Sequence, residues 1–279
     1  MRIRIVDAFT DQPFAGNPAA VCLLEAGPWP DESWMHQVAA EMALSETAFA
    51  RPLTDDPDAD WDLRWFTPTV EAKMCGHATL ATTHAMMSDG LLNDLNGKVR
   101  FNSRSGVLIA SVTQDQAITM DFPVSSPETV EVPKGLIAAL GAEAAGVTEV
   151  YRTGPLGDLL VELDDENAVR SAVPDLAAIE VITERDGFRA LLLTALADPV
   201  REYDFVSRFF APSHGIPEDP VTGSAHTGLA PYWAKRLGRE ELVGYQASTR
   251  GGLVRVVLAG DRVLLTGQAV TVLDGELKV

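Results

Sequence analysis

Apolar and polar residues alternate over short segments through much of the chain, and this is the period of half-buried β-strands. Besides the alternating N-terminus, Met1–Val6, the segments that read as strands are Lys98–Phe101, Val107–Val112, Ala117–Phe122, Asp158–Leu163, Phe188–Leu193, Leu253–Leu258 and Arg262–Gln268. A final strand-like piece, Gly275–Val279, is predicted to return to the first half of the chain. The pattern therefore predicts a protein built mainly of short strands.

A different period marks two amphipathic helices. Between Asp31 and Met42, the apolar side chains Met35, Val38, Ala39 and Met42 recur on one helical face, and Asp31 follows a proline as an N-cap residue would. A second helix is predicted over Asp164–Ala172.

Two further segments, Met74–Ser88 and Pro220–Ala234, carry no Asp, Glu, Lys or Arg over 15 residues each. A helix without charge on any face is normally buried on all faces. Each segment is therefore predicted to form one central buried helix.

The same two regions contain an internal repeat. One copy is Arg64-Trp65-Phe66-Thr67-Pro68, and the other is Arg208-Phe209-Phe210-Ala211-Pro212. Each copy is followed by a glycine and one further residue near the start of an uncharged segment, Gly76-His77 or Gly223-Ser224. The repeat predicts an α+β fold of two similar halves, each a curved sheet around one buried helix. The halves are placed at residues 1–122 and 123–269, with 270–279 returning to the first and Pro123–Val132 as the crossover.

Composition agrees with two domains and excludes several partners. A chain of 279 residues with 46% hydrophobic residues is long enough for two cores. The net charge of −18 argues against nucleic acid and against an anionic membrane surface. We expect neither a transmembrane helix nor a signal peptide, and two cysteines are too few for a disulfide framework, so a cytoplasmic location is expected.

The two glycines at the predicted helix starts are candidates for anion binding. A helix N-terminus has unpaired N–H groups and a positive partial charge, and glycine lets a ligand approach the backbone. Gly76 and Gly223 together could hold one carboxylate without a lysine or arginine. The alternative is that both glycines only permit tight turns before the helices.

Ionisable residues stand at these helix starts. His77 follows Gly76, Ser224 follows Gly223, and Asp219 lies four residues before Gly223. Histidine suits proton exchange near neutral pH, whereas the alternatives are a histidine bonded to a loop carbonyl and a helix-capping aspartate near Thr222.

Glu46 lies among apolar neighbours at a helix-to-strand junction, where a carboxyl group could serve in acid/base catalysis. Its spacing with Ala48 and Ala50 by itself favours an outward-facing strand residue instead.

Other chemistries find no support in the sequence. The phosphate-binding and dinucleotide-binding glycine motifs are absent, as is the Gly-X-Ser-X-Gly motif of hydrolases. No spacing of zinc ligands is present, including around His214 and His226, so no metal site is expected. His36 and His84 are interpreted as structural.

Several segments, in order along the chain, resemble the PhzF family of phenazine biosynthesis. They are Val6-Asp7-Ala8-Phe9-Thr10, Phe14-Ala15-Gly16-Asn17-Pro18-Ala19, Leu44-Ser45-Glu46-Thr47-Ala48-Phe49, Arg64-Trp65-Phe66-Thr67-Pro68, Cys75-Gly76-His77-Ala78-Thr79 and Glu218-Asp219-Pro220-Val221-Thr222-Gly223-Ser224-Ala225. The resemblance implies the diaminopimelate-epimerase-like fold, with the site between two pseudo-symmetric halves.

The resemblance also implies an activity: a cofactor-free isomerase that moves a proton on a small carboxylated substrate and is commonly a homodimer. The family's catalytic glutamate falls on Glu46, and its other site residues fall on His77, Asp219 and Ser224. Related epimerases use one cysteine at each Gly motif. Here Cys75 precedes Gly76 but Thr222 precedes Gly223, so a two-thiol mechanism is not expected and Cys75 is interpreted as a small buried residue.

Two other functions remain open at this point. One is an amino-acid or hydroxy-acid racemase or epimerase that uses Glu46 and His77 as an unequal pair. The other is a non-catalytic member of the fold that binds a small molecule or a protein.

Overall fold

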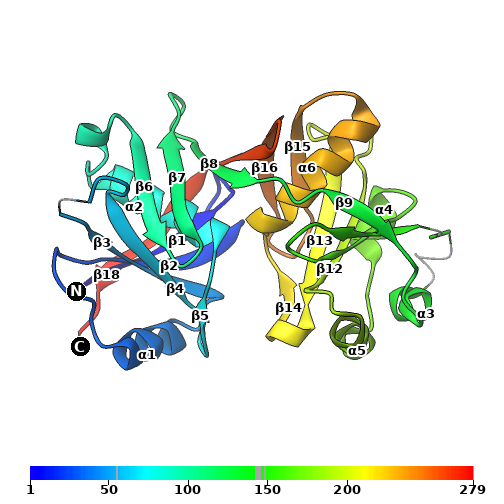
Figure 1. Cartoon of the computed structure of the whole chain (residues 1–279), viewed down its shortest axis with the longest axis horizontal. Helices are drawn as coiled ribbons and strands as arrows, with labels where there is room; N and C mark the ends of the chain where they lie inside the picture. The colour runs from blue at the N-terminus through cyan, green and yellow to red at the C-terminus, as the bar shows by residue number, and fades with distance from the viewer. Residues whose placement is uncertain (55, 142–145, 148, 279) are drawn as a thin grey trace. The chain divides into compact units, whose positions relative to one another are not determined.

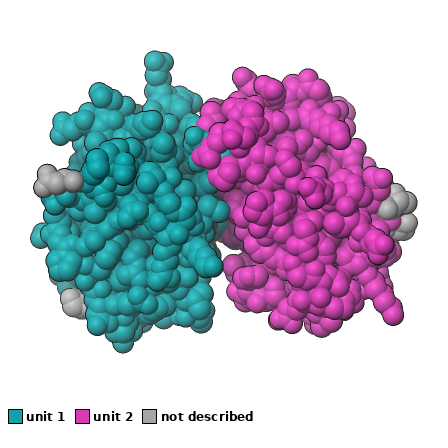
Figure 2. All heavy atoms as spheres, in the orientation of Figure 1, with its two compact units in different colours: residues 1–122, 266–279 teal, residues 123–265 magenta. Residues whose placement is uncertain are grey.

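The computed structural model describes residues 1–279 except 55, 142–145, 148 and 279. The chain forms two compact units, Met1–Phe122 with Thr266–Val279, and Pro123–Leu265, coloured separately in Figure 2. The return to the first unit thus begins at Thr266, whereas the sequence placed it at residue 270. Among the described residues, no helix is long and apolar enough to cross a membrane.

The first unit is a mostly antiparallel sheet that contains two pairs of parallel strands. Its elements in chain order are β1 (Arg2–Ala8), β2 (Asn17–Leu23), α1 (Glu32–Met42), β3 (Glu46–Pro52), β4 (Trp61–Phe66), β5 (Glu71–Ala72), α2 (Gly76–Ser88), β6 (Lys98–Ser103), β7 (Gly106–Val112), β8 (Ile118–Pro123) and β18 (Ala269–Glu276). The pairs β2–β3 and β4–β6 are parallel, and the other pairs that fix its order are antiparallel: β18–β1, β1–β2, β3–β4, β4–β5, β6–β7 and β7–β8. Each pair of parallel strands requires a crossover connection, which contains α1 between β2 and β3 and α2 between β4 and β6.

The second unit repeats this scheme. Its elements are β9 (Pro127–Val130), α3 (Leu136–Leu140), β10 (Val150–Thr153), β11 (Leu159–Glu162), α4 (Glu166–Ser171), α5 (Leu176–Asp186), β12 (Leu191–Leu196), β13 (Phe205–Ala211), β14 (Ile216–Asp219), α6 (Gly223–Leu237), β15 (Glu241–Gln246), β16 (Gly252–Ala259) and β17 (Arg262–Gly267). The parallel pairs are β11–β12, crossed by α4 and α5, and β13–β15, crossed by α6. In Figure 1, α6 (orange) runs beside the strands of its own unit.

The strand order confirms the repeat read from the sequence. The two Arg-aromatic-aromatic segments lie in β4 and β13, each followed by a short antiparallel strand, a buried helix and a parallel partner strand. The two predicted uncharged helices are therefore α2 and α6, and the predicted helix at Asp31–Met42 is α1, with Asp31 as its N-cap.

Several details of the sequence prediction were incomplete or wrong. The strand expected over Phe188–Leu193 runs instead over Leu191–Leu196. The expected crossover Pro123–Val132 contains the strand β9, which pairs with β10. The terminal strand covers Ala269–Glu276 and not Gly275–Val279, and Val279 lies outside the described residues. The helix α5 was missed, although its buried residues Ile179, Ile182 and Thr183 recur at helical spacing. The helix expected over Asp164–Ala172 is shorter, Glu166–Ser171, with Asp165 as its cap.

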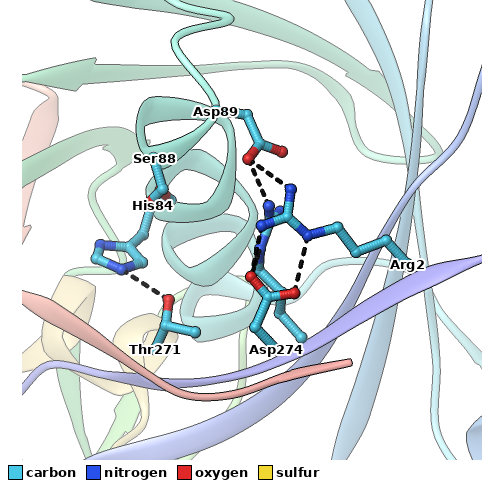
Figure 3. A network of polar contacts seen from close by, with 7 residues as sticks. Arg2, His84, Ser88, Asp89, Thr271 and Asp274 are labelled. Carbon is cyan, nitrogen blue, oxygen red and sulfur yellow. Dashed lines mark hydrogen bonds and ion pairs between the residues drawn. The ribbon is translucent and has the colours of Figure 1, made fainter. Parts of the chain in front are cut away.

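Ion pairs hold the returning strand β18 against β1. The buried Arg4 guanidinium lies 2.5 Å from Asp89 and 3.3 Å from Asp274, and Arg2 bridges the same two carboxylates. Figure 3 shows Asp89 at the end of α2 and Asp274 on β18 converging on the Arg2 side chain. His84 of α2 also contacts Thr271 of β18 at 3.1 Å. These contacts explain why a strand from the end of the chain closes the first unit.

The helix α2 carries three buried threonines whose hydroxyl groups form hydrogen bonds within the helix. Thr79, Thr82 and Thr83 are buried, and each hydroxyl donates a hydrogen bond to the carbonyl one turn earlier, at 2.6 to 2.9 Å. Because these donors are paired, the helix can lie among strands on all sides without an unpaired hydroxyl.

The helix α6 buries a histidine completely. The Nδ1 of His226 donates to the Thr222 carbonyl at 2.8 Å, so the neutral ring has no proton on Nε2. That Nε2 finds no hydrogen-bond partner among the described residues. Burial lowers the pKa of His226 to about 4, against the opposing effect of the Thr222 hydrogen bond.

This pKa predicts a pH dependence of stability. Since the folded pKa lies below the ordinary value of 6.5, the contribution of neutral His226 is fully present above about pH 6.5. It is lost as the pH falls toward about 4, by up to ~1.4 kcal/mol per pH unit. Urea unfolding of wild type between these values should show this loss.

The variant His226→Asn keeps a donor for the Thr222 carbonyl and cannot titrate, so it should unfold with a flatter pH profile. His214→Asn, at an exposed histidine, is the matched control and should retain the wild-type profile. Identical slopes for wild type and His226→Asn would contradict the assignment.

Candidate active site

In the first unit, three chemically active side chains meet where α2 begins. The Glu46 Oε2 lies 3.3 Å from the His77 Nε2, and the Cys75 Sγ lies 3.4 Å from the His77 Nδ1. Cys75 and His77 are buried, and the Glu46 side chain is only 13% exposed. The fold therefore brings together Glu46 and His77, two residues that the sequence proposed separately, and adds Cys75.

Local geometry places Glu46 on the buried side of the sheet. Helix α1 ends at Ala43 in the left-handed conformation, and β3 starts at Glu46 beside Ala19 of the parallel strand β2. Ala48 and Ala50, which share its face of the strand, are fully buried. The interpretation of Glu46 as an outward-facing strand residue is therefore wrong, because β3 is covered on both faces.

Two polar residues fix the orientation of the His77 ring. The buried Asn17 amide nitrogen lies 3.2 Å from Nδ1, so Nδ1 accepts its hydrogen bond and the ring proton resides on Nε2, toward Glu46. Ser45 donates to the Asn17 Oδ1 at 3.4 Å and lies 3.5 Å from the His77 Nε2. His77 thus bonds to side chains, which differs from the loop-carbonyl alternative. Asn17 and Ser45 stood in the motifs but were not identified as site residues.

In the second unit, Asp219 is tied to the start of α6. The Thr222 hydroxyl donates a hydrogen bond to the carboxylate of Asp219, which is 7% exposed at the end of β14. The buried Gln246 accepts from the Thr222 N–H at 2.8 Å and donates to the Asp219 carbonyl at 2.7 Å. Asp219 therefore contacts Thr222, as its capping alternative anticipated, although Thr222 caps the helix without a side-chain hydrogen bond of its own.

Ser224 belongs to a separate ion-pair group that the sequence did not indicate. The Arg189 Nη1 donates to the Ser224 hydroxyl at 3.1 Å, and the same guanidinium makes two bonds of 2.6 and 2.8 Å to the fully buried Asp158. Arg189 fell inside a predicted strand, and only the fold shows that its charge lies beside α6. This part of the acidic chain thus has a guanidinium beside α6, paired with a buried carboxylate.

Both helices begin at the predicted glycines, Gly76 and Gly223. The cap residues Cys75 and Thr222 are extended, and neither makes a side-chain cap bond to the helix. The first-turn N–H groups have no partner inside the helix and carry the positive end of its dipole. Each helix start can therefore donate hydrogen bonds to an anion.

The chain is similar to known proteins over nearly its whole length. The sequence model of the family described as phenazine biosynthesis-like protein matches residues 6–275. The chain is 43% identical over 278 residues to a protein of Halalkalibacterium halodurans named as an uncharacterised isomerase, covering 99% of this chain and 97% of that one. It is 38% identical to a human phenazine biosynthesis-like domain-containing protein, with coverage of 99% and 98%.

Solved structures show the same fold. A PhzF-family crystal structure from Enterococcus faecalis superposes with a TM-score of 0.88 at 38% identity, covering 100% of this chain and 99% of that one. A hydroxyproline epimerase from Agrobacterium vitis superposes with a TM-score of 0.63 at 12% identity, with coverage of 99% and 91%, and this likeness concerns the fold alone.

The relatives identify an isomerase, and the solved structures show the epimerase-like α+β architecture, two similar halves each wrapped around a buried helix, as the sequence predicted. Within this class, the chain belongs to the PhzF family of phenazine biosynthesis-like proteins.

The Gln246 contacts predict a large effect on stability. Gln246→Ala removes three buried hydrogen bonds and leaves the Thr222 N–H and the Asp219 carbonyl without their partner. A loss of about 2–4 kcal/mol in the free energy of unfolding is expected, measured by urea titration. Gln268→Ala, at an exposed side chain, should change it by less than about 0.5 kcal/mol. Equal effects would show that Gln246 does not organise the start of α6.

Proposed function

We propose that the protein is a cofactor-independent isomerase that moves a proton on a small carboxylated substrate bearing amino or hydroxyl groups and a double bond. The observation that carries the proposal is that the Glu46 carboxylate lies 3.3 Å from the His77 Nε2, the ring nitrogen that bears the hydrogen. A carboxylate that can take a proton from carbon and return it to another carbon needs no redox partner.

The surroundings of Glu46 suit this role. Its backbone pairs with Ala19 of β2 at the start of β3, and its carboxylate faces a ring whose orientation Asn17 sets. A base held in this way can act on a bound substrate without a search over rotamers, which is how positioning contributes to the rate. His77 can hold the carboxylate by donating a hydrogen bond from Nε2–H.

Each helix start, at Gly76 in the first unit and at Gly223 in the second, is proposed as an anion-binding point for a substrate carboxylate, because its first-turn N–H groups can receive an anion. Asp219 and Ser224 are proposed to bind the amino or hydroxyl groups, as the family resemblance implies. Ser224 keeps its hydroxyl oriented through Arg189. The resemblance also implies a homodimer, which light scattering on the purified protein tests.

The proposal predicts solvent-proton exchange that depends on Glu46. Wild type is incubated in D2O with a dihydro-hydroxyanthranilate and with related unsaturated amino and hydroxy acids, and deuterium uptake is followed by mass spectrometry. Glu46→Gln keeps the shape of the side chain but cannot take a proton, so exchange should fall at least about 100-fold.

Glu41→Gln, at an exposed glutamate on α1, is the matched control and should exchange at the wild-type rate. Full activity of Glu46→Gln on a compound that wild type converts would overturn the assignment of the base. Loss of optical activity without a change in absorbance would identify a racemase instead.

A further inference from the structure

Glu46, Cys75 and His77 have a second property that proton transfer does not use. Each offers one donor atom of a type that binds transition metals, and the three donor atoms lie within 4.8 Å of one another. The sequence showed no such set, because Glu46 is far from the other two along the chain and Cys75 and His77 are separated by a single residue. The two residues reach the same point because Cys75 is extended and His77 lies in the first turn of α2.

The separations match those around a tetrahedral ion. Zinc bonds of about 2.0–2.2 Å to nitrogen and oxygen and about 2.3 Å to sulfur place donors about 3.4–3.6 Å apart at tetrahedral angles. The His77 Nε2 is 3.3 Å from the Glu46 Oε2 and 3.9 Å from the Cys75 Sγ. The third separation, between the Glu46 oxygen and the Cys75 Sγ, is at most 4.8 Å, so an ion could be accommodated with side-chain shifts of up to about 1 Å.

We propose that Glu46, Cys75 and His77 form a binding site for a zinc-class divalent cation, and that the bound cation inhibits the enzyme. Three protein ligands leave a fourth position for water or a substrate group. Inhibition follows because the ion occupies the Glu46 carboxylate that the proposed proton transfer requires. The inhibitory part rests on the proposed function, whereas binding of the ion does not.

Ligand chemistry decides which ions bind. Binding releases the Cys75 thiol proton, and the resulting thiolate with the Glu46 carboxylate balances the two positive charges of the ion. A thiolate and an imidazole favour Zn²⁺ and Co²⁺ over Mg²⁺ and Ca²⁺, which prefer oxygen ligands.

The side chain of Asn17, which contacts the His77 Nδ1, must change its orientation when an ion binds. When Nε2 binds the ion, Nδ1 carries the proton and needs an acceptor, which Asn17 provides if its side-chain amide turns over. Asn17 is therefore the positioning residue of the site in both states.

A spectroscopic titration tests the site directly. Chelator-treated protein is titrated with Co²⁺, and a thiolate-to-cobalt absorption band is the expected signature, with displacement of the band by Zn²⁺ and none by Mg²⁺. Cys75→Ala should lose the band and bind at least about 100-fold more weakly. Cys22→Ala, at the other buried cysteine, is the matched control and should retain it.

Glu46→Gln, which preserves the shape of the side chain, should keep the band but bind at least about tenfold more weakly. It tests the site even if Cys75→Ala does not fold. Absence of a band in wild type, or a band that persists in folded Cys75→Ala, would overturn the proposal.

Deuterium exchange in the presence of Zn²⁺ separates the two proposals. Inhibition at the same concentration at which Zn²⁺ displaces Co²⁺ is the expected result. Binding without inhibition of an active enzyme would overturn the inhibitory part alone. A cobalt band in a protein that exchanges no proton under any condition would leave the metal site intact and contradict the proposed function.

Discussion

The structure depends on a helix in each unit that must be buried without charge. A helix surrounded by strands cannot send a charged side chain to solvent, so its polar groups must bond within the helix or to the sheet. In α2 the threonine hydroxyls bond to carbonyls one turn earlier, and in α6 a neutral His226 bonds to the Thr222 carbonyl. Once this condition is met, the sheet can close around each helix, and the helix start becomes a fixed point.

That fixed point explains where the chemistry lies. The cap residue of α2 is extended and the next residues enter the first turn, so Cys75 and His77 project from a backbone that the sheet holds. Glu46 reaches the same place because β3 is a buried strand beside β2. A carboxylate, an imidazole and a thiol are thus brought within contact distance, and both the proposed proton transfer and the proposed cation site rest on this arrangement.

The repeat gives the two units the same framework but different polar residues. The first unit places Glu46 and His77 near its helix start, and the second places Asp219 near its own, with Arg189 and Ser224 forming a further group. Arg189 is balanced by the buried Asp158, so it adds a directed hydrogen-bond donor without creating a free charge. Divergence of polar residues on a common framework is how one fold can support different reactions.

The sequence by itself determined the fold class, the repeat and the positions of the helices α1, α2 and α6, because these depend on periodicity and on the absence of charge over long segments. Its motifs also singled out Glu46, His77, Asp219 and Ser224. Only the tertiary structure decided whether Glu46 faces solvent, since local spacing favoured an exposed side chain while the fold leaves it mostly buried. The contacts of Asn17 with His77 and of Arg189 with Ser224 likewise join residues that are distant in the chain. The contact of Cys75 with His77 depends on how the backbone enters α2. A local sequence pattern predicts neither kind of contact.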